Sequence, residues 1–115
     1  MLAVAIGAFG AHGLRDLVEP KYIPIYEKGV SYQFYHTFAL LAVGILYSLF
    51  PFKSLQLANT FFILGILCFS GSLYLMTLLS IKQISIGPVG IITPIGGLFF
   101  IAGWVSMLMG VLKKG

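Results

Sequence analysis

The chain has 115 residues, of which 59% are hydrophobic and only 9% are charged, and its formal net charge is +4. A soluble domain of this size needs many more polar residues to cover its surface, so the composition excludes an ordinary water-soluble protein. The basic residues are scattered along the chain and do not gather on one face, which argues against nucleic-acid binding. We therefore expect a single transmembrane domain, residues 1–115, whose surroundings are the lipid bilayer.

A first helix is predicted at residues 1–14. It is short, because a helix of that length reaches only about 21 Å and the hydrocarbon core of a membrane is about 30 Å thick. No lysine or arginine precedes Arg15, so this segment lacks the basic start of a cleaved signal peptide. Gly13 and the charged residues that follow it suit the end of a helix that leaves the membrane.

Long stretches without a charged residue follow, at residues 29–52, 54–81 and 83–112. Each is longer than the roughly 20 residues that an α-helix needs to cross about 30 Å of hydrocarbon. They predict three membrane-spanning helices, at about residues 24–49, 57–79 and 94–112. The fold class is therefore an all-α integral membrane four-helix bundle whose first helix is short.

The segments that join these helices have distinct patterns. Pro24 suits a first helical turn, and tyrosines such as Tyr26 and Tyr35 mark an interfacial extension before the second helix crosses. The turn "FPFKSLQ", residues 50–56, makes the second and third helices an antiparallel hairpin. "ISIGPVGIITPIGG", residues 84–97, carries two prolines and four glycines and predicts an irregular apolar loop before the last helix.

Small residues at helical spacing provide the means of helix association. Lipid is as apolar as leucine, so membrane helices associate through close packing and interhelical hydrogen bonds. Small residues recur every four positions in the first helix, as Ala3, Gly7 and Ala11, and a shorter row, Gly44 and Ser48, occurs in the second helix. We expect these rows to pack the bundle, although one of them could instead be the seam of a homo-oligomer. The predicted packing positions are Ala3, Gly7, Ala11, Gly71, Gly96, Gly103 and Gly110.

Specific strings resemble a known family. They are "GAFGAHGL" (residues 7–14), "YQFYHTFALL" (32–41), "FSGSLY" (69–74), "TPIGG" (93–97) and "AGW" (102–104). In this order they resemble domain of unknown function 423, also called uncharacterised protein family 0382, with a relative in the transmembrane protein 256 group. The resemblance implies a four-helix protein of the bacterial inner membrane, with no established catalytic or ligand-binding residue to carry over. Family members also have apolar residues ahead of the position of Met1, so the first helix is expected to be incomplete.

Polar residues share one face of the second helix and could meet the end of the first. Lys28, Tyr32 and His36 follow at four-residue spacing. The resulting candidate cluster is His12, Glu27, Tyr32, Gln33 and His36. Ionisable groups at membrane depth suggest function by default. The structural alternative is that both histidines bond to Tyr32, Gln33 or backbone carbonyls and lock the first two helices together.

The sequence supports neither an enzyme nor a metal or cofactor site. Two histidines and a distant glutamate are too few for a usual metal site, and nothing beyond the two rings supports haem. All three acidic residues lie in or beside the first loop, far from any candidate nucleophile. In "FSGSLY", the hydroxyls of Ser70 and Ser72 are expected to bond back to the preceding turn or across to a neighbouring helix.

Two functions remain open. The first is a noncatalytic membrane protein that supports membrane integrity or a membrane complex. The alternative is a small transporter or channel subunit whose pathway is lined by His12, Gln33 and His36. The Lys and Arg count is nearly equal on the two sides, with Lys53, Lys113 and Lys114 on one. The expected orientation has cytoplasmic termini.

Overall fold

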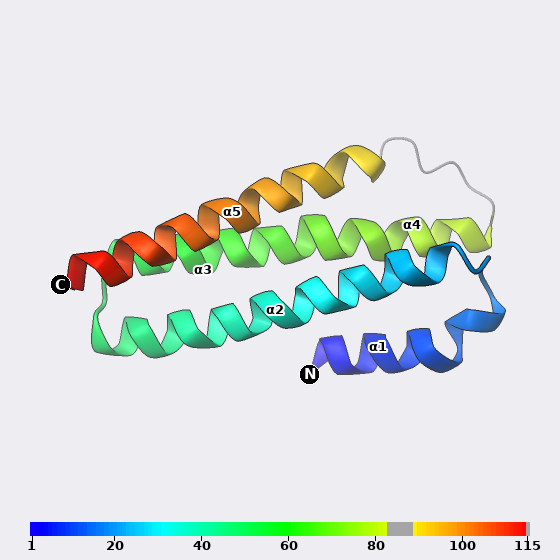
Figure 1. Cartoon of the computed structure of the whole chain (residues 1–115), viewed down its shortest axis with the longest axis horizontal. Helices are drawn as coiled ribbons and strands as arrows, with labels where there is room; N and C mark the ends of the chain where they lie inside the picture. The colour runs from blue at the N-terminus through cyan, green and yellow to red at the C-terminus, as the bar shows by residue number, and fades with distance from the viewer. Residues whose placement is uncertain (83–88, 115) are drawn as a thin grey trace.

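The computed structural model describes residues 1–82 and 89–114, and the part described is almost entirely helical (Figure 1). The prediction of an all-α bundle with a short first helix is confirmed. In chain order the helices are α1 (Leu2–His12), a 3₁₀ turn η1 (Leu14–Asp16), α2 (Tyr22–Leu49), α3 (Lys53–Gly65), a π-helical turn η2 (Ile66–Ser70), α4 (Gly71–Ile81) and α5 (Val89–Lys114).

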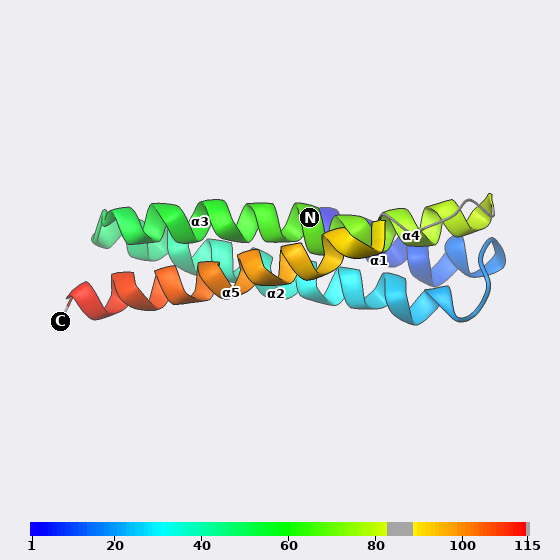
Figure 2. The ribbon, with the colours of Figure 1, turned by 90° about the horizontal axis from the view of Figure 1, so that it is seen from above.

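Three helices are long and apolar enough to cross a membrane: α2, the continuous α3–η2–α4 helix and α5. The 28 residues of α2 correspond to about 42 Å, close to the thickness of a bilayer with its headgroups. All the helices run along the long axis of the molecule, which extends 51 Å (Figure 2). The 11 residues of α1 reach only about 16 Å, and α1 lies beside the first half of α2 (Figure 1).

Two helix boundaries differ from the prediction. The helix after the hairpin turn begins at Lys53, directly after Phe52 in extended conformation, ahead of the predicted start near residue 57. The last helix begins at Val89, so that Pro94 lies inside it. A proline in the second turn removes only one backbone hydrogen bond, the one to the carbonyl of Gly90, and the helix tolerates this loss. Residues 83–88, which belong to the predicted irregular loop, lie outside the described residues.

The contact between α3 and α5 is built from two matched seven-residue repeats. Leu55 and Phe62 of α3 each face a glycine of α5, and Phe69 of η2 does the same. A Cβ atom added at Gly103 would lie 2.6 Å from the ring of Phe62, and one at Gly96 would lie 2.7 Å from the Cα of Phe69. The glycines are therefore required for this close approach. The pairs, in order, are Leu55 with Gly110, Phe62 with Gly103, and Phe69 with Gly96.

The contact of α1 with α2 differs from the predicted row in one position. Ala3 is buried and Gly7 lies close to Val30, but Ala11 is exposed. The neighbouring Gly10 takes the contact instead, since a Cβ there would lie 2.7 Å from the Tyr26 ring. Each four-residue step turns about 40° past a full turn of the helix, so the third residue of a row with strict four-residue spacing points away from the interface. A row whose spacings alternate between four and three residues stays in the interface.

A π-helical turn interrupts the long third helix between Gly65 and Gly71. The ring of Phe100 occupies the space that a side chain at Gly65 would need. A side chain at Gly71 would meet only ordinary contacts, so of the two glycines Gly65, and not the predicted Gly71, permits a close approach. The turn places Phe69 against α5 and turns Ser70 toward α2.

Candidate functional site

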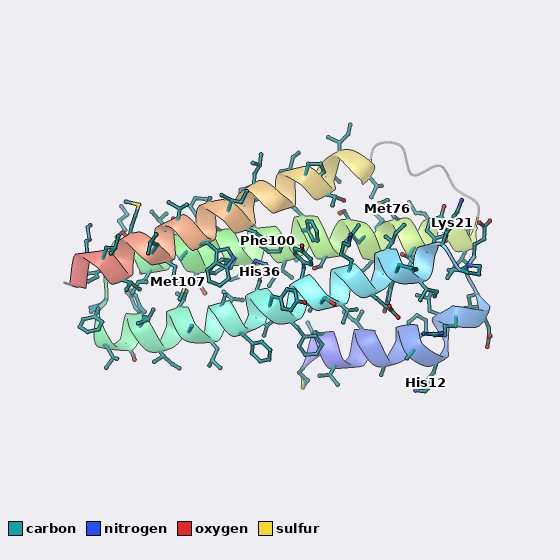
Figure 3. The ribbon with its side chains drawn as sticks, in the orientation of Figure 1. His12, Lys21, His36, Met76, Phe100 and Met107 are labelled. Atoms are coloured by element: carbon teal, nitrogen blue, oxygen red, sulfur yellow. The ribbon has the colours of Figure 1, made fainter. Side chains whose placement is uncertain are left out.

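His36 lies at the meeting point of the three long helices. It is only 5% exposed, and its ring lies parallel to the ring of Phe100 from α5 at a centroid distance of 3.5 Å. Figure 3 shows the two rings together between α2 and α5. Phe62 of α3 closes the third side, with ring centroids 5.6 Å apart. The histidine is therefore enclosed by aromatic side chains.

Both ring nitrogens of His36 are hydrogen-bonded. Nδ1 lies 2.8 Å from the carbonyl oxygen of Tyr32, one turn earlier on α2. The indole nitrogen of Trp104 on α5 donates to Nε2 over 3.1 Å. A carbonyl only accepts and an indole N–H only donates, so the geometry selects the neutral tautomer with its hydrogen on Nδ1. His36 thus connects α2 to α5 and leaves no ring nitrogen for a ligand.

A second group of polar contacts connects α1, α2 and α4. The hydroxyl of Tyr74 donates to Oε1 of the buried Gln33 over 2.6 Å. The ring of Tyr74 lies 5.2 Å from that of Tyr26, whose hydroxyl donates to the carbonyl of Ile6 over 2.6 Å. The two tyrosines therefore join three helices through hydrogen bonds and ring contact.

The serines of "FSGSLY" bond both within their helix and across the bundle, as predicted. The buried Ser70 donates to the carbonyl of Gly29 on α2 over 2.7 Å. Ser72 donates to the carbonyl of Phe69 over 2.8 Å and also bonds to the hydroxyl of Thr93 on α5. Ser70 therefore joins η2 to α2, and Ser72 joins the start of α4 to α5.

Of the predicted polar cluster, the structure brings only Tyr32 and His36 into contact, through the carbonyl of Tyr32 and Nδ1 of His36. Gln33 and His36 are buried, but they bond to different partners on different helices. The side chain of Tyr32 is partly exposed and stacks on Phe69 at 4.6 Å. Glu27 is exposed and lies 3.7 Å from the guanidinium of Arg15. The cluster is thus not one site.

His12 lies outside any polar cluster, contrary to the prediction that it reaches Gln33 or His36. Its side chain is exposed and points away from α2 (Figure 3). Gly10 faces α2, and a residue two positions later lies about 200° around the helix, on the opposite side. Within residues 1–82 and 89–114, the imidazole of His12 makes no hydrogen bond.

Sequence reasoning missed Trp104 and Phe100 as partners of His36, and Tyr26 and Tyr74 as partners of Ile6 and Gln33. Trp104 is the only tryptophan, and it lies in the last helix of the predicted bundle. A tryptophan N–H inside a membrane needs an acceptor, so a lone tryptophan and a lone mid-helix histidine form a natural pair. That signal is present in the sequence.

The chemistry of these sites is that of hydrogen-bonded ties between helices. In the described part of the chain, no three His, Cys, Asp or Glu side chains lie together in a way that could hold a metal ion. Cys68 is half-buried in η2. The buried polar side chains Gln33, His36 and Ser70 bond to groups on other helices of the same chain.

Three apolar spans, a short first helix and buried interhelical polar ties define a small multi-pass α-helical membrane protein. Residues 6–97 match the family described as "Protein of unknown function (DUF423)". The chain belongs to this family, also named UPF0382, as the resemblance in the sequence indicates.

The curated relatives are bacterial proteins named as UPF0382 membrane proteins. One from Staphylococcus saprophyticus is 42% identical over 113 residues, covering 98% of this chain and 89% of the relative. YwdK of Bacillus subtilis is 42% identical over 114 residues, with the same coverage. One from Haemophilus influenzae is 42% identical over 111 residues, covering 96% of this chain and 85% of the relative. No solved structure matches the chain.

Proposed function

We propose that the protein is a noncatalytic helix bundle that supports the membrane or a complex within it. The observation that carries this proposal is that the ring of His36 is fully occupied by contacts within the protein. Its two nitrogens bond to the Tyr32 carbonyl and to Trp104, and its face stacks on the ring of Phe100. A general base or a transport residue needs a nitrogen that can reach a substrate or water. In this fold neither nitrogen is free, because Nδ1 bonds to the backbone of α2 and Nε2 bonds to Trp104 of α5.

The same use of polar groups extends to Gln33 and Ser70, which bond to Tyr74 and to the Gly29 carbonyl. Such bonds inside a membrane contribute about 0.6 kcal/mol each on average and define which faces meet. The outer surface of the bundle carries exposed apolar side chains, including Phe38, Leu41 and Leu98, which suit lipid or the helices of another membrane protein.

His36→Ala tests this role against transport. The substitution removes a ring that contacts Phe62 and Phe100 and leaves the Trp104 N–H without its acceptor, so we expect a loss of about 3 kcal/mol in the free energy of unfolding. Leu41→Ala, at a side chain 62% exposed, is the control and should change stability little. Thermal unfolding in detergent measures both variants.

Proteoliposomes containing the wild-type protein provide the second arm of this test. We expect no flux of protons, common ions or small metabolites above that of empty liposomes. A flux that His36→Ala abolishes while the variant keeps wild-type stability would support a transporter or channel subunit and contradict the proposal.

We infer a location in the bacterial inner (plasma) membrane with the C-terminus in the cytoplasm. The relatives are bacterial membrane proteins, and the end of the bundle that carries the C-terminus has three lysines, Lys53, Lys113 and Lys114, beside the ends of membrane-spanning helices. A C-terminal alkaline phosphatase fusion should therefore be inactive and a C-terminal green fluorescent protein fusion bright. The reverse result would contradict this orientation.

A further inference from the structure

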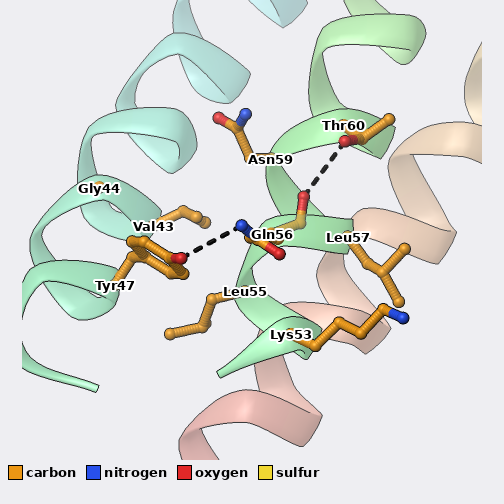
Figure 4. Close-up of a pocket in the computed structure, with 9 residues that line it drawn as sticks. All are labelled: Val43, Gly44, Tyr47, Lys53, Leu55, Gln56, Leu57, Asn59 and Thr60. Atoms are coloured by element: carbon orange, nitrogen blue, oxygen red, sulfur yellow. Dashed lines mark hydrogen bonds between the residues drawn. The ribbon is translucent and has the colours of Figure 1, made fainter. Parts of the chain in front are cut away.

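A groove with polar side chains at its mouth lies between α2 and α3, beside the turn that joins them. Its volume is about 570 Å³, within the range of small-molecule sites. Figure 4 shows its lining side chains, among them Tyr47 of α2 and Lys53, Gln56 and Asn59 of α3. These four residues are exposed, so the groove opens to the outside of the bundle. We call it the α2–α3 groove.

The groove lies at the depth of lipid headgroups and the glycerol beneath them. The helix that begins at Lys53 has 29 residues, or about 43 Å, and exceeds the roughly 30 Å of hydrocarbon by several ångströms at each end. Lys53 and Gln56 in its first turn therefore lie at headgroup level. Asn59 lies about 9 Å further along the axis, near the start of the acyl chains.

The groove carries hydrogen-bond donors that the protein leaves free. Gln56 donates to the Tyr47 oxygen over 3.1 Å, so the hydroxyl hydrogen of Tyr47 remains available. Within residues 1–82 and 89–114, neither the Lys53 ammonium nor the Asn59 amide has a hydrogen-bond or ion-pair partner. An unpaired amide facing lipid is costly, which indicates a polar partner from outside the chain. Three free donors around one groove suit an anionic group rich in acceptors.

The charge of this end of the molecule favours an anion as well. Gly110 of α5 contacts Leu55, so Lys113, one turn after Gly110, lies level with the start of α3. The three acidic residues precede residue 28 and belong to the opposite end. Lysines beside a membrane attract anionic lipid, at about 1 kcal/mol each.

The α2 wall of the groove is shaped by Gly44. A Cβ added there would meet no atom within 4 Å, so this glycine leaves open space instead of admitting another helix of the bundle. The buried Val43 and Leu55 form an apolar floor beside it. The groove thus combines an apolar base with hydrogen-bond donors at its mouth. This suits a phospholipid, whose polar headgroup is joined to apolar acyl chains.

We propose that the α2–α3 groove binds an anionic glycerophospholipid. The phosphate accepts hydrogen bonds from Lys53 and Tyr47, an ester carbonyl beside the glycerol accepts from the deeper Asn59, and the upper part of an acyl chain covers Gly44 and Val43. This site goes beyond the proposed bundle function and does not depend on it.

Native mass spectrometry of the full chain in detergent tests the site, with dioleoyl phosphatidylglycerol and dioleoyl phosphatidylcholine as probes. We expect phosphatidylglycerol to bind at least about fivefold more tightly. Lys53→Gln should remove most of this preference. Lys82→Gln removes the same charge at the other end of the bundle and should leave the preference unchanged.

A steric variant tests the groove without changing its charge. Gly44→Leu should fill the groove and weaken phosphatidylglycerol binding by about tenfold while the unfolding temperature stays at or above that of the wild type, because the site is open and leucine is a better helix former. Gly97→Leu, at another open glycine outside the groove, is the control and should leave binding unchanged.

Four results would overturn the proposal. They are equal binding of the two lipids, equal loss from Lys53→Gln and Lys82→Gln, unchanged binding in Gly44→Leu, and displacement of the lipid by millimolar inorganic phosphate. The second would indicate attraction by overall charge, and the last would indicate a site for free phosphate.

Discussion

At the scale of single residues, the buried polar side chains of this protein act as selective contacts between helices. His36 accepts from Trp104, Gln33 accepts from Tyr74, and Ser70 donates to a carbonyl of another helix. Each contact pairs one donor with one acceptor, so it selects a particular partner residue. Apolar packing alone does not make this selection. A residue that bonds in this way defines which faces of two helices meet.

The Tyr74–Gln33 contact should show a measurable coupling energy. Tyr74→Phe, Gln33→Leu and the double variant form a cycle in which the hydroxyl donor and the amide acceptor are removed separately and together. We expect a coupling energy of about 0.6 kcal/mol, and not more than about 1.7 kcal/mol, because the unfolded chain in a membrane also finds partners. Denaturation in detergent micelles measures the cycle.

Tyr35 provides the control for this cycle. Its ring is 58% exposed, and its hydroxyl has no hydrogen bond within the described residues, so Tyr35→Phe combined with Gln33→Leu should give additive effects. A coupling energy of zero for Tyr74 and Gln33, equal to that of the control pair, would contradict the contact.

At the scale of helices, glycines decide how closely α5 approaches α3. The seven-residue repeat of Gly96, Gly103 and Gly110 is visible in the sequence, and all three glycines are buried in the interface. Its partners, such as Phe62, are not predictable from the repeat, because a glycine row indicates that a helix approaches without indicating which one. The α1 row is wrong at Ala11 because a strict four-residue spacing drifts out of a nearly parallel helix contact.

Two adjacent glycines of α5 should respond in opposite ways to alanine. In Gly96→Ala the new Cβ meets the backbone of Phe69, which cannot move aside as a flexible side chain can, so we expect a loss of about 1–3 kcal/mol or more in stability. In Gly97→Ala the Cβ meets no atom within 4 Å, and the higher helix propensity of alanine should add up to about 1 kcal/mol.

Thermal unfolding of both variants in the same detergent checks this difference. Equal destabilisation by the two substitutions would mean that glycine flexibility, and not the close contact with η2, explains the role of Gly96.

At the scale of the whole molecule, composition and charge-free stretches predict the fold well. Uncharged runs of sufficient length define the three spans, and the 11-residue α1 is short as expected. The candidate site is less predictable, because it depends on rotation of each helix about its axis. His36 and Trp104 lie 68 residues apart, and His12 differs from Gly10 by only two positions yet faces the opposite way. The π-helical turn has no compositional signal, since its residues also suit an α-helix.

The central claim is that the polar groups inside this bundle hold helices together and are closed to water. The most direct test is ¹⁵N nuclear magnetic resonance of histidine-labelled protein in lipid bilayers at neutral pH, with exposed His12 as the internal reference. We predict that His36 carries its proton on Nδ1, that its bare Nε2 couples to the Trp104 indole proton, and that the ring proton exchanges with water far more slowly than that of His12. A protonated Nε2, or water exchange as fast as at His12, would contradict the account.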